Sequence, residues 1–514
     1  MKQSIFSSEE FVPPKTLEYD LVIVGTGAGG AEAARHLSKH FKVALIEEGP
    51  FRKTEDFKML ESMAFPELYQ DGGARMTADG AIKILQGKSV GGSTTVNWTS
   101  SFRIPSRTLE YWNKNYGIKS LTAESLSEHF DKIEKQYSIE RWSGTPNQNN
   151  QKLADGMEKL GIQYGVIPRN VKGCYDLGHC GHGCPTGAKQ STLVNALPDA
   201  LAQGAHLYCQ FRAMKLVEKG ELIHEIEAYP VTATGKLTIK DPLRIKAKQF
   251  IVCGGGINTP ILLMRSHIPD PFGNLGKRTF LHPVSVSLAR FSESIDGFSG
   301  APQSIYSDYF LWPDDDRMGF KIESAPIHPA LTSSLLHLHG KASSEIMQGF
   351  RHFQAAIALG RDGFHPDAPG GRVVMLSEGR FALDYPWNSY LVESYQRSLK
   401  TLASIQFAAG ALEVYPLHRH SSLFKSIIEV ENFINKSSTS KYDLSVVSAH
   451  VMGGAAMGID EKNSVVDNKG RHHQIENLYI FDGSLFPTSL GVNPTESILA
   501  ISSLLSHQFI LDNK

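Results

Sequence analysis

Three of the five cysteines of this 514-residue chain lie in one short stretch, "CYDLGHCGHGCPTGAKQST", residues 174–192. Cys174, Cys180 and Cys184 have the spacing C-x5-C-x3-C, and Pro185 follows the last of them. Glycines between the thiols give the backbone freedom to bring them together, and a cysteine followed by proline is typical of ferredoxin motifs. Three thiolates in this arrangement could hold a [3Fe–4S] cluster.

Three other interpretations of this loop stay open. A disulfide is disfavoured, because so few cysteines in so long a chain indicate a reducing compartment. A zinc ion could recruit His179 or His182, although adjacent ligands such as His179 and Cys180 fit tetrahedral geometry poorly. The thiols could also be packed side chains of a glycine-rich loop that binds nothing.

A second set of chemically informative residues is the run Gly25-x-Gly27-x-x-Gly30. Apolar residues 21–24 before it predict a buried strand, a helical stretch follows it, and Glu47 ends the next apolar run. Gly25 would permit the tight bend, Gly27 would let the backbone approach a pyrophosphate, and Gly30 would allow close packing of helix on strand. Because Glu47 can accept hydrogen bonds from a ribose, the pattern predicts dinucleotide binding rather than a turn without a ligand.

A segment near the C-terminal end could complete the same site. Apolar residues 478–481 predict a strand that leads into Asp482 and Gly483, and a helix is expected to begin at Pro494. The N-terminus of that helix could stabilise negative charge on a reduced flavin ring. The glycine run alone suits either NAD or FAD. This distant second segment suits a bulky two-ended cofactor and is compatible with FAD.

Further elements must position these residues. Residues 249–266 have the pattern of another strand, glycine turn and helix of the same sheet, and aromatic strand-like runs lie between 291 and 440. We therefore predict an α/β fold, α+β overall, in which a substrate-binding domain built on an antiparallel sheet is inserted into a Rossmann-like FAD-binding domain. The expected boundaries are 15–105, 166–290 and 441–514 for the FAD-binding domain, and 106–165 and 291–440 for the substrate-binding domain.

Composition excludes several other classes of protein. A formal net charge of −1 gives no reason to expect nucleic acid as a partner. No apolar run approaches the length of about 18 residues that a transmembrane helix needs. Residues 1–16 lack the apolar segment of a secretory signal, so we expect a cytoplasmic protein.

Five ordered motifs resemble the glucose–methanol–choline (GMC) family of FAD-dependent oxidoreductases. They are "VIVGTGAGG" with "LIEEG", "GKSVGGSTTVNW", "CGGGINTPILLMRS", "SAHVMGGAAMG" and "FDGSLFPTSLGVNPTES". The third departs from the family pattern at Gly256 and His267, where a small non-glycine residue and a glycine are common. "SAHVMG", "CPTGAKQST" and "ESAPIHPAL" look most like the long-chain alcohol oxidase and dehydrogenase branch. The cysteine spacing instead resembles FAD-dependent glucose dehydrogenases, where it holds a [3Fe–4S] cluster.

The resemblance implies an active site built on His450 and Asn493. His450 of "SAHVMG" would be the general base that takes the hydroxyl proton while hydride leaves for the flavin N5. Asn493 would hydrogen-bond the substrate oxygen, although it could also be only an N-cap of the helix that follows.

The resemblance also implies how FAD is bound. Relatives that attach FAD covalently carry a histidine in the segment that matches 87–98, and no histidine lies there in this chain. We therefore expect non-covalent FAD. The predicted cofactor-binding residues are Gly25, Gly27, Gly30, Glu47, Gly91, Gly92, Ser93, Asn97, Asp482, Gly483, Asn493, Pro494 and Thr495.

Together, the motifs predict FAD-dependent oxidation of an alcohol to an aldehyde or ketone. We expect a hydrophobic or long-chain alcohol as substrate, and oxygen or an unknown redox partner as electron acceptor. One alternative is a sugar dehydrogenase that passes electrons through a [3Fe–4S] cluster to a partner. Another is a non-catalytic flavin-binding protein, and the pairing of His450 with Asn493 argues against it.

Overall fold

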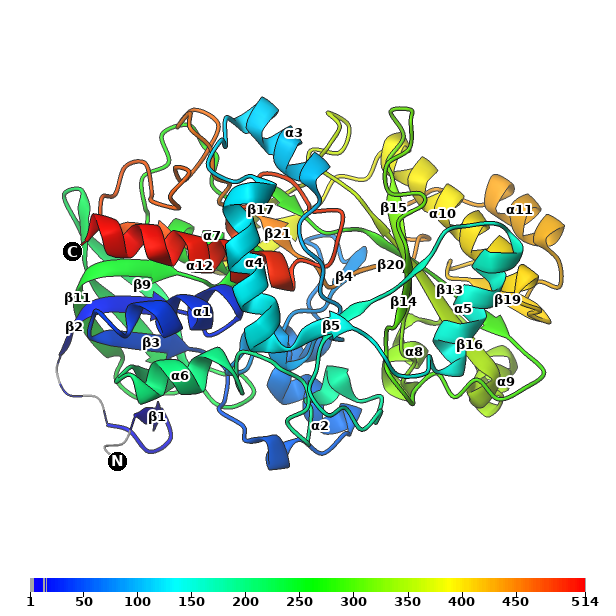
Figure 1. The fold of residues 1–514 in the computed structure, drawn as a ribbon, viewed down its shortest axis with the longest axis horizontal. Coiled ribbons are helices and arrows are strands. Elements are labelled where there is room, and N and C mark those ends of the chain that lie inside the picture. The colour runs from blue at the N-terminus through cyan, green and yellow to red at the C-terminus, as the bar shows by residue number, and fades with distance from the viewer. Residues whose placement is uncertain (1–3, 13, 15, 514) are drawn as a thin grey trace.

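A computed structural model describes residues 4–12, 14 and 16–513. It contains two large sheets, each covered by helices, which lie side by side along the longest axis (Figure 1). The mixed α/β fold predicted from the sequence is confirmed. Residue 15, the expected start of the first domain, lies outside the described residues.

The first sheet is parallel at its centre. Its strands lie in the order β1–β8–β3–β2–β11–β10–β9, and β22 also pairs with β11. The bounds are β1 (Ile5–Ser7), β2 (Leu17–Val24), β3 (Val43–Glu47), β8 (His206–Cys209), β9 (Phe211–Lys219), β10 (Leu222–Pro230), β11 (Leu243–Val252) and β22 (Leu478–Ile480). In the register, Val24 lies opposite Val252, which lies opposite Ile480, so three strands end at the same edge.

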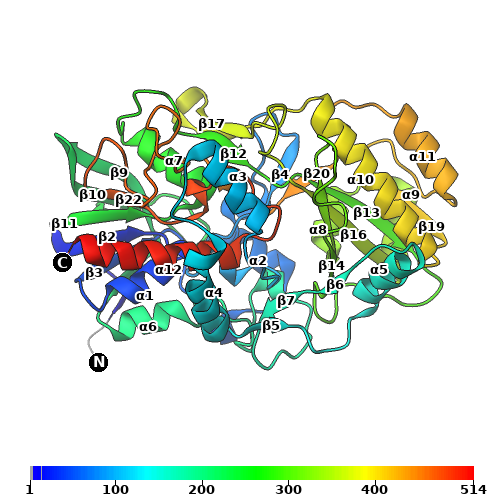
Figure 2. The same ribbon diagram turned by 45° about the horizontal axis from the view of Figure 1, so that its top comes forward.

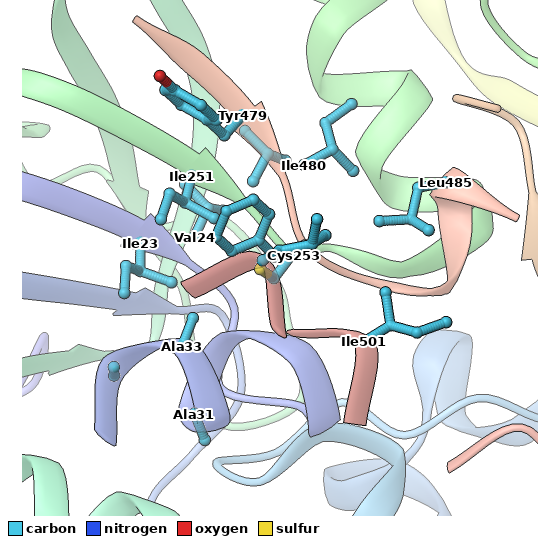
Figure 3. Close-up of a cluster of buried hydrophobic side chains, with 14 of the residues drawn as sticks. Ile23, Val24, Ala31, Ala33, Ile251, Cys253, Tyr479, Ile480, Leu485 and Ile501 are labelled. Carbon is cyan, nitrogen blue, oxygen red and sulfur yellow. The ribbon is translucent and has the colours of Figure 1, made fainter. Parts of the chain in front are cut away.

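Helix α1 packs against the first sheet through small side chains. Figure 3 shows Ala31 and Ala33 of α1 beneath strand residues such as Ile23 and Ile251. The helices associated with this sheet are α1 (Ala28–Leu37), α6 (Ala196–Ala202), α7 (Gly255–Arg265) and α12 (Thr495–Asp512). Helix α12 begins one residue later than predicted, because Pro494 occupies its N-cap position.

Glycines of α1 are required by this close packing. Gly25 has a φ of +95°, which only glycine adopts readily. A Cβ added to Gly30 would lie 2.0 Å from the carbonyl oxygen of Gly25, and one added to Gly29 would lie 1.8 Å from that of Phe481. The turn and the start of α1 are therefore fixed against both neighbouring strands.

The second sheet is antiparallel at its centre. Its order is β4–β20–β13–β16–β15–β14–β6, and β19 also pairs with β13. The bounds are β4 (Ile82–Ile84), β6 (Gly165–Val166), β13 (Val284–Arg290), β14 (Ile305–Ser307), β15 (Phe320–Ser324), β16 (Phe353–Gly360), β19 (Glu413–Pro416) and β20 (Val446–Ser448). Its helices are α5 (Gln148–Lys159), α8 (Pro329–Leu335), α9 (Gly340–Gln348), α10 (Ser389–Ala408) and α11 (Ile427–Lys436).

The two faces of the second sheet differ in chemistry. Successive side chains of a strand point to opposite faces. Ser285 and Ser287 of β13 face α10, where their hydroxyls contact the hydroxyl of Ser398 and donate to the amide oxygen of Gln406. The alternate residues of β13 and β16 form an aliphatic surface with α8 and α9 on the opposite side (Figure 1).

The remaining elements lie around the junction of the two sheets (Figure 2), and four of their strands form a smaller antiparallel sheet of their own. These elements are α2 (Glu61–Leu68), α3 (Ser106–Tyr116), α4 (Ala123–Tyr137), β5 (Ile139–Arg141), β7 (Pro168–Asn170), β12 (Lys277–Phe280), β17 (Gly371–Met375), β18 (Phe381–Asp384) and β21 (Met452–Gly453). Although α3 and α4 fall in the segment expected for the substrate-binding domain, their buried Trp112 and Phe130 belong to the core of the first sheet. No helix among the described residues is long and apolar enough to span a membrane.

The close packing of α1 yields a stability prediction. Gly30→Ala is expected to lower the free energy of unfolding of the apoprotein by about 1–3 kcal/mol, because its Cβ must displace backbone. Gly27→Ala is the matched control: its Cβ would meet only the Cα of Gly92, at 3.9 Å. We expect Gly27→Ala to lower the free energy of unfolding by less than about 1 kcal/mol, because alanine is a poorer N-cap residue than glycine. Equal losses in thermal or denaturant unfolding would contradict this account.

Candidate active site

A cavity of about 830 Å³ runs from the strand ends of the first sheet to the aliphatic face of the second. Its size is typical of a ligand site. Most predicted site residues line it; Gly30 and Gly91 do not. The predicted residues at its wall are Gly25, Gly27, Glu47, Gly92, Ser93, Asn97, His450, Asp482, Gly483, Asn493, Pro494 and Thr495.

The cofactor end of the cavity is framed by two glycine turns. A Cβ added to Gly92 would lie 2.8 Å from the Cα of Gly27, so the turns approach each other closely. The N–H of Gly91 donates to the hydroxyl of Thr26 at 2.9 Å and fixes one turn on the other. Since Gly27 faces open space at the N-terminus of α1, the frame leaves room for a pyrophosphate.

Glu47 is anchored at the same end. One carboxylate oxygen accepts the N–H of Thr26 at 3.0 Å and its hydroxyl at 2.7 Å, and the other accepts the N–H of Gly49 at 2.8 Å. Burial raises the pKa of Glu47 to about 7. Oε1 accepts only the N–H of Gly49 and so retains acceptor capacity, as ribose binding would require.

Asp482 ties two of the three strand ends together. Its Oδ2 accepts the N–H of Gly255 at 2.6 Å and the hydroxyl of Thr259 at 2.7 Å. Its Oδ1 accepts the N–H of Ser484 at 2.8 Å. Burial raises the pKa of this carboxyl. Asp482 therefore joins the first turn of α7 to the turn after β22 at the cavity wall.

Three buried acceptor atoms at the cavity wall have no partner within the described part of the chain. They are Oδ1 of Asn97, Oδ1 of Asn493 and Oε1 of Glu323. Buried polar atoms in proteins are almost always hydrogen-bonded, so we expect these atoms to accept hydrogen bonds from a bound group. Together with the open glycine frame and the anchored Glu47, they fit a dinucleotide such as FAD and a polar substrate atom.

His450 contacts a second buried histidine, His282, which the sequence motifs do not include. The Nδ1 atoms of His282 and His450 lie 3.3 Å apart, and the N–H of Gly491 donates to Nε2 of His282 at 3.0 Å. Burial lowers the pKa of both histidines, that of His450 to about 4. A neutral His282 that accepts at Nε2 must carry its proton on Nδ1. It then donates to His450, whose own proton lies on Nε2.

Glu323 of β15 lines the cavity and was not predicted from the sequence. Its Oε2 accepts the side-chain N–H of Gln303 at 2.8 Å and that of Asn493 at 3.3 Å. Burial raises its pKa to about 7. Glu323 pairs with Ile357 of β16, which places it at the margin of the aliphatic face. The available sequence signal for Glu323 was that two charged residues, Lys321 and Glu323, interrupt the short apolar run "GFKIES".

The contact with Glu323 also defines the place of Asn493. Its side-chain amide donates to Glu323, and the N-terminus of α12 shows no side-chain cap. The interpretation of Asn493 as only an N-cap is therefore not supported. The nearby amide of Asn97 donates to the hydroxyl of Thr495 at 3.4 Å and links segment 87–98 to α12.

The cysteine loop lies outside the cavity wall. Cys180 Sγ lies 4.0 Å from Nη2 of Arg169, and Lys189 donates to the carbonyl of Cys180 at 2.7 Å. All three thiols are free, and within the described ranges they do not form a group whose sulfurs lie within 4.8 Å of one another. These contacts do not support a [3Fe–4S] cluster, which stays a prediction.

Comparison with known proteins identifies a family. Two models described as GMC oxidoreductase match residues 65–284 and 374–502, more than half of the chain together. The long-chain-alcohol oxidase FAO4B of Arabidopsis thaliana is 29% identical over 522 residues, which cover 96% of this chain and 68% of the plant protein. The chain thus spans about two thirds of the length of this relative.

Solved structures share the fold. A formate oxidase of Aspergillus oryzae, studied for modification of its FAD, has a TM-score of 0.72 at 13% identity and covers 97% of this chain and 99% of its own. Pyridoxine 4-oxidase from Mesorbium loti has a TM-score of 0.68 at 17% identity, with 96% and 99% covered. At these identities the likeness establishes the fold alone.

The buried Glu323 yields a prediction about pH. Folding raises its pKa from 4.5 to about 7, so the folded protein binds this proton more tightly than the unfolded chain does. Ionisation therefore costs stability as the pH rises from about 4.5, and the cost is complete above about 7. Glu323→Gln should gain up to about 3 kcal/mol relative to the parent protein between pH 5 and pH 8.

Denaturant unfolding of the apoprotein at several pH values measures this difference. Glu10→Gln, which changes an exposed acid, is the matched control and should show no such trend. If the difference in unfolding free energy between Glu323→Gln and the parent protein is the same at every pH, folding does not raise the pKa of Glu323.

Proposed function

The chain belongs to the GMC oxidoreductase family of FAD-dependent enzymes, and from that premise we propose that it oxidises long-chain apolar alcohols. The observation that carries the substrate class is the aliphatic half of the cavity. We call it the apolar chamber. Its walls are Val284, Val286 and Leu288 of β13, Ala355, Ile357 and Leu359 of β16, Leu331 and Leu335 of α8, and Ile327, Leu336, Leu417 and Val447.

The apolar chamber argues against a sugar as substrate. Each sugar hydroxyl buried against aliphatic walls would lose its hydrogen bonds to water, at a cost of about 1–3 kcal/mol on protein scales. An alkyl chain instead gains about 0.8 kcal/mol for each methylene group it buries. The name of the plant relative, a long-chain-alcohol oxidase, agrees with this choice and suggests oxygen as the final electron acceptor.

Polar groups gather where the chamber meets the cofactor end. His450, Asn493 and Glu323 all line the cavity at this junction. An alcohol whose chain occupies the chamber would present its hydroxyl to these three side chains. The glycine turns, Glu47 and the N-terminus of α12 would hold FAD, which would accept the two electrons that leave the alcohol.

His450 and Asn493 would orient the substrate oxygen. The hydrogen-bond chain from Gly491 through His282 supports a resting His450 that carries its proton on Nε2. This N–H can donate to the substrate oxygen and stabilise the negative charge that develops there. The sequence predicted His450 as the general base, and this proposal gives it the role of donor.

Glu323 would take the hydroxyl proton. Its Oε1 is buried and without a partner, so an O–H of the substrate would satisfy it. A pKa of about 7 suits a general base that works near neutral pH, whereas a pKa of about 4 makes His450 a weak base. Lys321 lies two residues away on the same strand, and its buried ammonium donates to Asp308 at 2.7 Å.

Anaerobic reduction of the bound FAD tests both the substrate and the roles. We expect dodecanol to bleach the flavin absorbance and glucose to leave it unchanged. Below about pH 7 the rate should fall about tenfold for each pH unit, because only ionised Glu323 accepts a proton. Glu323→Gln should slow reduction by about 10²–10⁴-fold and remove this pH dependence.

A pair of His450 variants separates donor from base. His450→Gln keeps an N–H donor and should lose less activity than His450→Ala. If both variants lose about 10²-fold or more and the parental rate is constant between pH 5 and pH 8, the base is His450 and the assignment of Glu323 is wrong. Bleaching by glucose alone would favour the sugar dehydrogenase alternative.

A further inference from the structure

Three histidines from two distant segments meet beside the cysteine loop. His179 and His182 lie in the loop, and His328 comes directly before α8. Each histidine offers one ring nitrogen, and these three nitrogens all lie within 4.8 Å of one another. The Nδ1 atoms of His179 and His182 are 2.9 Å apart, and the ring centroids of His182 and His328 are 4.5 Å apart.

These rings are in the protonation state that binds a metal ion. His182 is 4% exposed and His328 is 7% exposed. Burial lowers the pKa of His182 to about 3 and that of His328 to about 4, and it also lowers the pKa of His179. All three rings are therefore neutral near pH 7, and a neutral imidazole has a free nitrogen lone pair.

The surroundings orient the rings as metal ligands are usually oriented. Nε2–H of His328 donates to the carbonyl of Gly178 at 3.3 Å, which leaves Nδ1 of that ring unprotonated. Histidine ligands commonly donate their second nitrogen to a backbone carbonyl in this way. The hydroxyl of Tyr69 donates to the carbonyl of Gly181 at 2.7 Å and holds the loop between His179 and His182.

A negative charge lies next to the histidines. The carboxylate of Glu61 accepts the N–H groups of Ala330 and Leu331, at 2.6 Å and 2.8 Å, in the first turn of α8. Its charge raises the pKa of His179, in opposition to the larger effect of burial. A cation placed among the rings would gain from the same attraction.

We propose that His179, His182 and His328 bind one zinc ion, with water as the fourth ligand. Imidazole nitrogens that bind zinc at about 2.0–2.1 Å in a tetrahedron lie about 3.3 Å from one another. The nitrogens are already within 4.8 Å of each other, so small rotations of the rings reach this geometry. Three nitrogen ligands without a thiolate suit zinc and exclude magnesium and calcium, which prefer oxygen.

The ion would attach α8 to the cysteine loop. α8 follows His328 directly, and its Leu331 and Leu335 form one wall of the apolar chamber. A helix of seven residues has little stability of its own. Bound zinc would thus fix the position of this wall relative to the loop, which Lys189 in turn joins to the carbonyl of Asn97 at 3.1 Å.

Metal analysis of the purified protein tests the site directly. We expect about one zinc ion per chain by mass spectrometry, and less than about a tenth of that in His182→Ala and His328→Ala. His420→Ala changes an exposed histidine outside the cluster and is the control, which should keep its zinc. Cys174→Ser, Cys180→Ser and Cys184→Ser combined should also keep it, because the thiols are not ligands in this proposal.

Two further measurements do not depend on the histidine variants folding well. Removal of metal by a chelator should lower the melting temperature of the parent protein, and added Zn²⁺ should restore it. Co²⁺ in place of zinc should give the visible absorption of a tetrahedral site. A purified protein with less than about a tenth of an ion per chain and no change in melting temperature with Zn²⁺ would overturn the proposal. So would loss of the metal in the combined cysteine variant.

Discussion

The geometry of the cavity depends on the hydrogen bonds that the buried carboxyl group of Asp482 accepts. Its hydrogen bonds to Gly255 and Thr259 fix the start of α7 against the end of β22. Helix α7 in turn places the segment that carries His450, because a Cβ on Gly256 would lie 2.9 Å from Val451 and 3.2 Å from the carbonyl of Gly453. The departure from the family pattern at Gly256 is thus explained by a close approach of backbone.

The strand, glycine turn and helix at this end of the cavity could be predicted from the sequence because their determinants are local. The strand, glycine turn, helix and acid from Leu21 to Glu47 follow one another within a single unit, so periodicity and glycine spacing identify them. The C-terminal strand and helix are short-range patterns as well. Parallel register then brings these segments to one edge, as the pairing of Val24, Val252 and Ile480 shows.

The contacts that His450 and Asn493 make with His282 and Glu323 could not be predicted in the same way. His282 and His450 are 168 residues apart, and Glu323 and Asn493 are 170 apart. No pattern in the sequence records such a contact, and a charged residue in an apolar strand does not disclose its partner. For α3 and α4, the spacing of apolar residues predicts a buried side but not which of the two sheets it meets.

The two ends of the cavity are built from different parts of the chain. Backbone N–H groups and glycines at strand ends form the cofactor end, whereas the apolar chamber is formed by side chains that alternate along β13 and β16. Substitutions on those strands would alter the volume available to a ligand without moving the glycine turns at the strand ends. Evolution could therefore retune the range of substrates by single mutations while the redox machinery was inherited unchanged, and directed evolution of this scaffold has the same freedom.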